Sequence, residues 1–264
     1  MQVAKVNSIR LHYQDTGPRD GLPLVFGNSL GTDFRIWDAV LAHLPEGLRI
    51  VRYDMRGHGL SDAPEDDYWM GDLVADAAGL IDHLGLANAV FVGLSIGGAV
   101  AQGLAAERPD LLRAAVLLDT AAKLGTEQSW RDRIAKVRAG GIDAIADQIL
   151  TLWFTRAFHA ARADELAVWR HMLTRTPVDG YCGSCAALSG MDLRESTARL
   201  RLPVLVAVGD EDGSTPPDLV RETAESIAGA RFEIIRGAGH IPCVEQPAAL
   251  SALITGFLKE QRLV

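Results

Sequence analysis

Ser95 stands in a sequence pattern that can turn a hydroxyl group into a nucleophile. The pentapeptide Gly-Leu-Ser-Ile-Gly follows an apolar run at residues 89–92 and precedes a helix-like stretch that begins at Gly98. A sharp turn from strand to helix strains the backbone of the serine, and only very small neighbouring residues permit that turn. The pentapeptide alone also occurs by chance, so this interpretation depends on the strand predicted before it and the helix predicted after it. We therefore expect Ser95 to attack an acyl carbon, with the backbone N–H of Ile96 as one donor to the oxyanion.

A nucleophilic serine needs a base and an acid that orients the base, and in this topology the chain order is serine, acid, histidine. His240 follows a glycine-rich turn after the apolar residues 232–235 and is the predicted base. The predicted acid is Asp212, in a loop after another apolar run. Asp210, in the same loop, and Asp119, after an earlier run, are the alternatives. No second histidine lies at ligand spacing from His240, so we predict no metal site.

Composition excludes several classes of partner. The chain has 264 residues and a net charge of −8, and it offers no clustered basic face for nucleic acid or an anionic membrane. Its three cysteines are an odd number without a disulfide framework, and no signal peptide is recognised, so we expect a cytoplasmic protein. The longest apolar stretch, residues 89–106, is interrupted by glycine and polar residues and favours a strand, a turn and a buried helix over a membrane span. Oligomeric state is open between a monomer and a small homo-oligomer.

Strand patterns alternate with helical ones along most of the chain, which predicts an α/β fold: a mostly parallel eight-stranded sheet with helices on both faces. The expected strands are residues 3–6, 9–13, 22–26, 49–53, 89–93, 114–118, 204–208 and 232–235. The expected helices are residues 37–44, 73–84, 98–107, 219–227 and 247–258.

One long segment interrupts this alternation. No buried strand is recognisable between Asp119 and Pro203, a gap far longer than one strand–helix–strand unit needs. We predict a core domain of residues 1–122 and 198–264, and an inserted helical cap of residues 123–197.

Several ordered motifs resemble those of the α/β-hydrolase superfamily over the whole chain. They are the loop after residues 24–26 with Trp37, the sequence Asp-Met-Arg-Gly-His-Gly-Leu-Ser at residues 54–61, the turn around Ser95, and Gly-Ala-Gly-His ending at His240. The resemblance implies a second oxyanion donor in the loop after residue 26, and alignment with relatives assigns it to the N–H of Leu30. Most relatives have His-Gly where this chain has Asn28-Ser29. Residues 54–61 are expected to be scaffold.

Segments of the loops and the predicted cap look more specifically like the 3-oxoadipate enol-lactonases. These segments are residues 28–32, 119–126 with Trp130 and Arg133, 180–188 and 240–247. The resemblance implies a cofactor-free enzyme of bacterial aromatic catabolism that opens a small anionic lactone. A carboxylate approaching an acidic protein needs a local cation, for which we favour Arg133. Trp130 lies on the same helical face and could donate its indole N–H, and we expect Trp130 and Trp153 to contact the substrate. Both tryptophans could instead form the core of the cap, and Arg133 could instead be a solvated surface residue.

Two other functions stay open: a broader carboxylesterase or lactonase of the same fold, and a homologue that binds a ligand without catalysis. Carbon–carbon bond hydrolysis could use the same three residues. Dehalogenase and epoxide hydrolase chemistry is disfavoured, because relatives with those activities carry aspartate at the position of Ser95.

Overall fold

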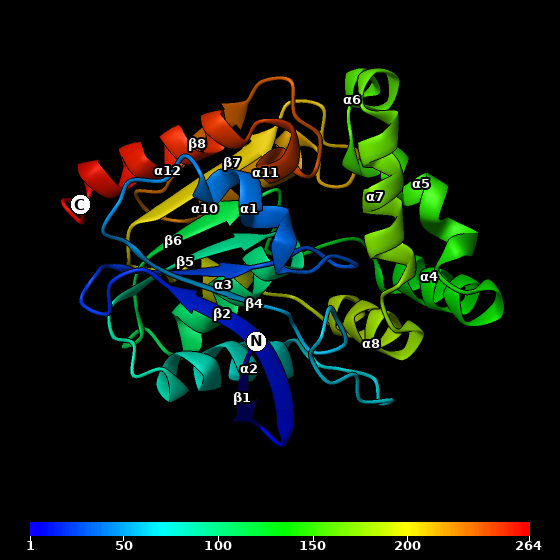
Figure 1. Ribbon diagram of the computed structural model, residues 1–264, viewed down its shortest axis with the longest axis horizontal. Coiled ribbons are helices and arrows are strands. Elements are labelled where there is room, and N and C mark those ends of the chain that lie inside the picture. The colour runs from blue at the N-terminus through cyan, green and yellow to red at the C-terminus, as the bar shows by residue number, and fades with distance from the viewer.

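A computed structural model describes residues 1–264 and contains one eight-stranded sheet (Figure 1). The strand order is β1-β2-β4-β3-β5-β6-β7-β8. The strands are β1 (Gln2–Val6), β2 (Ile9–Thr16), β3 (Pro23–Gly27), β4 (Arg49–Tyr53), β5 (Ala89–Leu94), β6 (Leu112–Leu118), β7 (Val204–Gly209) and β8 (Arg231–Ile235). Strand β2 is antiparallel to both β1 and β4, and all other pairs are parallel. The predicted fold class and its eight strands are confirmed.

Burial explains why the sequences of the central strands are continuous apolar runs. Every residue of β5 and of β7 is buried, as expected for parallel strands covered by helices on both faces. The first hairpin instead alternates exposed and buried residues along β1, because one side of this edge strand meets solvent.

Helices cover both faces of the sheet. The core helices are η1 (Phe34–Trp37), α1 (Asp38–Leu41), α2 (Met70–His83), α3 (Ile96–Glu107), α10 (Pro217–Ser226), α11 (Pro242–Glu245) and α12 (Pro247–Glu260). On one face, α1 packs against α11 and α12; on the other, α2 packs against α3 (Figure 1). Residues 37–44 were expected to form one helix, but α1 ends at Leu41. The following Pro45 disfavours helical geometry at Leu44, which explains the early end.

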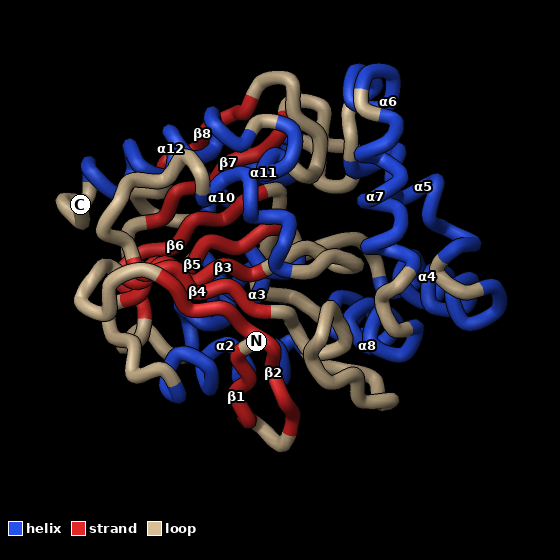
Figure 2. Tube along the Cα trace, in the orientation of Figure 1, coloured by secondary structure: helices blue, strands red, loops and turns tan.

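Six helices separate β6 from β7: α4 (Glu127–Gly140), α5 (Asp143–Trp153), α6 (Arg156–Ala161), α7 (Ala163–Thr174), α8 (Val178–Ser189) and α9 (Arg194–Thr197). Helices α4–α8 lie together beyond the carboxyl ends of the parallel strands, at the right of Figure 2. Helix α9 packs against α3 and α10, and Thr197 Oγ1 donates to Gln102 Oε1 at 2.9 Å. The segment predicted as the cap thus includes one short helix that packs with the core.

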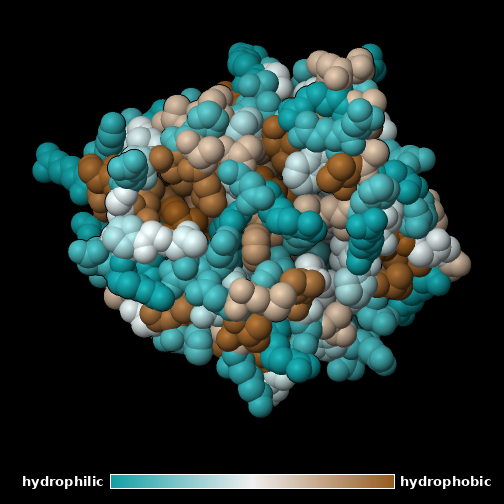
Figure 3. Space-filling view, viewed as in Figure 1, coloured by the Kyte–Doolittle hydropathy of each residue, from teal (hydrophilic) through white to brown (hydrophobic).

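The cap and the sheet share one hydrophobic core. Trp153, Phe158 and Leu173 of the cap belong to the same buried cluster as the sheet residues. On the face drawn in Figure 3, hydrophobic side chains form separate patches among hydrophilic ones. No helix combines the length and apolar character that crossing a bilayer requires. All three cysteines are free and buried.

A buried ion pair joins the loop after β4 to α2. Arg56 Nε and Nη2 donate to the two carboxylate oxygens of Asp76 at 2.6 and 2.8 Å, and Asn7 Nδ2 donates to Asp76 Oδ1 at 3.0 Å. Both charged side chains are almost fully covered. This pair anchors the segment that contains His58, which the sequence had indicated as scaffold.

We expect Asp76→Ala to lower the free energy of unfolding by about 3–5 kcal/mol, because it leaves the buried guanidinium of Arg56 with only the more distant and partly exposed carboxylate of Asp72, at 3.8 Å. Urea denaturation followed by tryptophan fluorescence measures this loss. Glu195→Ala is the matched control, since it removes an exposed partner of Arg199, and it should cost less than about 0.5 kcal/mol. Equal losses in the two variants would contradict the assigned importance of the buried pair.

Candidate active site

Ser95 occupies a strained turn between β5 and α3. Its φ of 57° and ψ of −117° place it in a region that side chains rarely adopt. A Cβ atom at Gly93 would lie 2.2 Å from the carbonyl oxygen of Gly97, and one at Gly97 would lie 2.4 Å from that of Gly27. Glycine is therefore required on both sides of the serine, which explains the pentapeptide. The turn holds the half-buried Ser95 at the carboxyl edge of the sheet.

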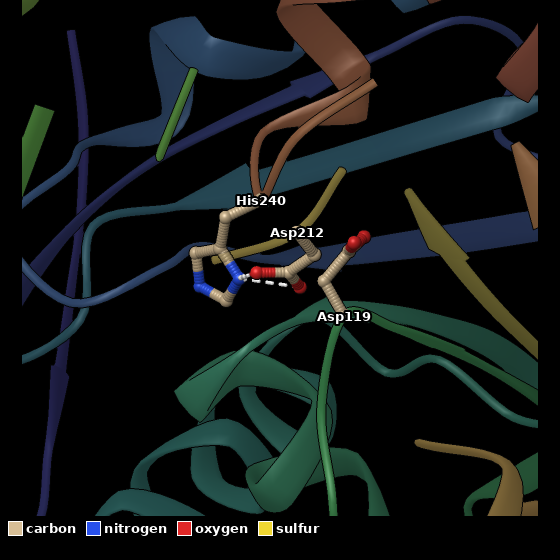
Figure 4. A group of neighbouring side chains, drawn as sticks. All are labelled: Asp119, Asp212 and His240. Atoms are coloured by element: carbon tan, nitrogen blue, oxygen red, sulfur yellow. Dashed lines mark hydrogen bonds and ion pairs between the residues drawn. The ribbon is translucent and has the colours of Figure 1, made fainter. Parts of the chain in front are cut away.

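His240 and Asp212 lie side by side after β8 and β7. The distances from His240 Nδ1 to Asp212 Oδ2 and Oδ1 are 2.9 and 3.1 Å, and the other ring nitrogen points away from Asp212 (Figure 4). Asp212 Oδ1 also accepts from the backbone N–H of Ser214 and of Thr215 at 2.7 and 2.9 Å. Burial opposes ionisation of Asp212, but the charge of His240 and the hydrogen bonds to Asp212 outweigh it and lower the pKa of this carboxyl. Asp212 is thus suited to orient the imidazole as an anion.

The other two carboxylates considered as the acid occupy different positions. Asp210 accepts from the backbone N–H of Gly237 at 2.7 Å and pairs with Arg236 on the outer side of the loop. Asp119 is buried beside Asp212 and makes no hydrogen bond to His240. Of the three candidates, only Asp212 contacts the imidazole.

The loop that carries His240 is held by two groups that the sequence did not indicate. Glu245 Oε2 accepts from the N–H of Gly239 at 2.7 Å, and Glu245 Oε1 accepts from Thr155 Oγ1 at 2.7 Å. The N–H of His240 donates to the carbonyl of Trp153 at 2.8 Å. Trp153 and Thr155 belong to the inserted segment, so the cap directly fixes the position of His240.

The two predicted oxyanion donors follow adjacent strands: Leu30 lies in the loop after β3, and Ile96 begins α3 after β5. Strand order reverses at this point, which creates a crevice at the carboxyl ends of an open sheet. Ile96 is the first residue of α3, so its N–H has no intrahelical acceptor, and the N–H of Leu30 donates to no protein group. The side chain of Asn28 turns away and bonds the Tyr53 carbonyl and the Trp37 indole. Although Asn28-Ser29 replaces the His-Gly of most relatives, these residues therefore place no competing acceptor on the N–H of Leu30.

His58 supports this loop, a specific contact within the segment of residues 54–61 that the sequence had indicated only as scaffold. Its Nε2 accepts from the N–H of Gly31 at 2.9 Å, so Nδ1 carries the proton and donates to the carbonyl of Arg56 at 3.1 Å. Burial lowers the pKa of His58, which keeps the ring neutral. A histidine in the turn of residues 54–61 does not by itself indicate this role, because its partner, Gly31, belongs to a loop far away in the sequence.

A cavity of about 190 Å³ contains most of the predicted site. Six of the eight predicted residues line it: Leu30, Ser95, Trp130, Arg133, Trp153 and His240. Ile96 is fully buried at the start of α3, and Asp212 lies behind His240. The Ser95 hydroxyl makes no hydrogen bond to His240 in this structure, although both groups face the same space. Catalytic hydrogen bonds often tighten only when substrate binds.

Arg133 and Trp130 contact each other at the cavity wall. The Arg133 guanidinium lies 4.7 Å from the Trp130 ring centroid, and no carboxylate lies within ion-pair distance of it. The expectation that Trp130 donates its indole N–H to substrate is wrong, because that group donates to the carbonyl of Leu124 at 2.6 Å. The cavity therefore presents one free guanidinium and an indole face, and no acidic side chain lines it.

A larger cavity, of about 910 Å³, lies between α7 and the segment that includes η1. It shares no lining residue with the cavity at Ser95. Its charged lining residues are mixed in sign, and several of them pair with each other: Arg162 with Glu165, and Arg35 with Asp33. Size alone does not identify the candidate site, since Ser95 and His240, the predicted nucleophile and base, line the smaller cavity.

Comparisons with known proteins agree with this geometry. Residues 23–247 match the family described as the alpha/beta hydrolase fold. The 3-oxoadipate enol-lactonase 2 of Acinetobacter baylyi is 34% identical over 251 residues, which cover 95% of this chain and 94% of the relative. The crystal structure of the enol-lactonase from Burkholderia xenovorans LB400 has a TM-score of 0.94 at 37% identity and covers 98% of this chain and 100% of its own. A thermophilic esterase from Thermogutta terrifontis has a TM-score of 0.92 at 28% identity, with 98% and 99% covered. Both resemblances seen in the sequence are confirmed.

We expect the stability of the protein to fall as the pH drops below about 6.5, partly through His58. Burial lowers the folded pKa of this ring, so between that value and 6.5 the unfolded chain binds a proton that the folded chain excludes. The loss should reach up to about 1.4 kcal/mol per pH unit and end below the folded pKa. His58→Gln keeps an acceptor for Gly31 and a donor for Arg56, and it should flatten this dependence.

Free energies of unfolding in urea at several pH values between 5 and 8 measure the effect. His43→Gln, at an exposed position, should keep the wild-type slope. Identical slopes for wild type and His58→Gln would refute the role of His58.

Proposed function

The chain belongs to the α/β hydrolase family, and we propose that it hydrolyses 3-oxoadipate enol-lactone to 3-oxoadipate through an acyl-enzyme on Ser95. One observation carries the proposal. A small cavity combines a serine in a strained turn, a histidine paired with a buried aspartate, and one unpaired guanidinium, without an acidic side chain in its wall. The similarity to the 3-oxoadipate enol-lactonase 2 of Acinetobacter baylyi supports this substrate, and the similarity to the Burkholderia xenovorans enol-lactonase supports an enol-lactone as the substrate class.

In the first half of the reaction, Ser95 Oγ attacks the lactone carbonyl. His240 Nε2 takes the hydroxyl proton, and Asp212 orients the ring and stabilises the imidazolium through Nδ1. The N–H groups of Leu30 and Ile96 donate to the oxyanion, and each such donor is worth about 3 kcal/mol in the transition state.

The leaving group in ring opening is an enolate, which departs more readily than an alkoxide. It takes up the proton that His240 received from Ser95 and becomes a ketone, which leaves the imidazole neutral again. Ring opening therefore demands less of His240 as an acid than ordinary ester cleavage does. The leaving arm stays attached to the acyl group, so water must reach the acyl carbon before the ring closes again. His240 then activates that water, and hydrolysis of the acyl-enzyme releases the product.

Arg133 would bind the acetate arm of the lactone. A carboxylate that approaches a protein of net charge −8 is repelled at long range, so a local cation must offset this repulsion. Arg133 is half-buried and has no anionic partner, and its guanidinium can hold a carboxylate with two hydrogen bonds. The cavity volume also favours a single ring with a short arm over a long acyl chain.

The second candidate function is a broader carboxylesterase, which the similarity to the Thermogutta terrifontis esterase favours. This alternative uses the same Ser95, His240 and Asp212. It differs in substrate preference, because a general esterase would cleave neutral short-chain esters faster than the anionic lactone.

We expect Ser95→Ala to abolish turnover of 3-oxoadipate enol-lactone while the protein stays folded, since no other nucleophile is proposed at the acyl carbon. The measurement is the initial rate of lactone opening, with circular dichroism as the folding control. Residual turnover above about one percent of wild type would argue against an acyl-enzyme on Ser95. A wild-type protein that neither opens the lactone nor reacts with a fluorophosphonate probe would favour a binding protein without catalysis.

We expect Arg133→Ala to raise the KM for the anionic lactone about 10- to 100-fold, because the substitution removes one hydrogen-bonded charge pair between enzyme and substrate. Its kcat/KM for a neutral nitrophenyl ester should change much less. Arg131→Ala is the matched control on the same helix, because Arg131 is exposed and pairs with Glu127. Should Arg133→Ala affect both substrates equally, or should wild type prefer the neutral ester, the esterase alternative would be favoured.

A further inference from the structure

A second buried carboxyl group, that of Asp119, lies behind the His240–Asp212 pair (Figure 4). Asp119 follows β6 and has a φ of +47°, a backbone conformation in which aspartate is tolerated better than most residues. Its Oδ1 accepts from the N–H of Gly209 at 2.9 Å, whereas its Oδ2 is buried without any hydrogen-bond partner. An acceptor oxygen without a donor in a dry site costs free energy, so this atom needs an explanation.

The proximity of Asp212 offers an explanation for the unpaired oxygen of Asp119. A carboxylate oxygen of Asp119, a carboxylate oxygen of Asp212 and a ring nitrogen of His240 all lie within 4.8 Å of one another. Two carboxylates at such a distance in a buried site do not both ionise at neutral pH, because their repulsion is weakly screened there. Asp212 has the imidazole and the N–H groups of Ser214 and Thr215 as donors, whereas Asp119 has one backbone N–H. The negative charge of the pair therefore belongs on Asp212.

None of the other titratable groups around Asp119 supplies a permanent positive charge that would favour its ionisation. They are His240 after β8, and Cys243 and Glu245 of α11. No lysine or arginine is among them, and Glu245 adds a second source of negative charge. Burial first, and then the charge of Asp212, raise the pKa of Asp119 well above its usual range.

We propose that Asp119 is a positioning residue that keeps a proton on Oδ2 and donates it in a hydrogen bond to Asp212, and that it replaces Asp212 in orienting His240 when that carboxyl is removed. The inference rests on the proposed function of Ser95 and His240. The proton of Asp119 stays in place during turnover: His240 receives the Ser95 proton, and Asp212 remains the anion.

Two consequences separate this arrangement from simple packing. A neutral Asp119 contributes a hydrogen-bond donor but no charge, so an amide can imitate it. Without Asp212, however, the repulsion from that carboxylate disappears, and burial is the main factor that still opposes ionisation of Asp119. Its carboxyl can then ionise and pair with the imidazolium that forms when His240 accepts the Ser95 proton.

The first test compares the acidic limb of the pH profile of kcat/KM in wild type and Asp119→Asn, with a neutral nitrophenyl ester as substrate. Asparagine tolerates the positive φ, accepts from Gly209 and donates to Asp212, so the midpoint of the limb should move by less than about 0.3 pH unit. If Asp119 were charged in the wild type, the substitution would remove a negative charge near His240. The midpoint would then fall by about one unit or more and overturn the proposal.

The second test compares Asp212→Ala with the double variant Asp212→Ala, Asp119→Asn. We expect the double variant to lose at least another tenfold in kcat with little change in KM, because Asp119 acts on His240 and not on substrate. The matched control is Asp212→Ala, Asp210→Asn, which should stay within twofold of Asp212→Ala, since Asp210 faces Gly237. Equal kcat in Asp212→Ala and in the double variant with Asp119→Asn would overturn the replacement role.

Ester turnover in wild type and Ser95→Ala keeps this result distinct from a failure of the proposed function. Turnover that survives Ser95→Ala would refute the proposed serine mechanism itself. If turnover depends on Ser95, but Asp119→Asn has no effect in the Asp212→Ala background, only the inference about Asp119 is refuted.

Discussion

The contact between two backbone segments, the turn around Ser95 and the loop after β3, is the constraint on which the site depends. Gly97 lies so close to Gly27 that no side chain fits between them, and its N–H donates to the carbonyl of Asn28 at 3.1 Å. The contact brings the start of α3 and the loop of Leu30 to the same point. The strained conformation of Ser95 and the positions of both proposed oxyanion donors are thus consequences of one close approach between segments that follow neighbouring parallel strands.

The inserted helices do more than cover this point. The carbonyl of Trp153 accepts from the N–H of His240, and Thr155 bonds to Glu245, which in turn holds Gly239. The residues that shape the cavity and the residue proposed as the base therefore share one hydrogen-bonded network. A change in the cap that shifts residues 153–155 would alter the geometry of the base as well as the choice of substrate.

Charge is distributed unevenly around the imidazole. Behind it, Asp119, Asp212 and Glu245 concentrate carboxyl groups in a buried region, where hydrogen bonds and protonation limit their repulsion. In front of it, the cavity contains a free guanidinium and no acid. The proposed anionic substrate would thus meet a local cation despite the net negative charge of the chain, and the imidazolium of the proposed mechanism would have the carboxylate of Asp212 beside it.

Sequence by itself determined the strands, their parallel packing, and the identities of Ser95, Asp212 and His240 as candidates, because hydrophobic period, glycine spacing and chain order are local properties. It also located the insertion, by the absence of strand patterns. Only the tertiary structure decided that the indole of Trp130 is already bonded to Leu124, that His58 supports the loop of Leu30, and that Asp119 lies against Asp212. Each of these contacts joins a side chain to a group whose position depends on how loops and helices pack in three dimensions. A local pattern shows which groups a residue can bond, but only the folded chain determines which group stands within reach.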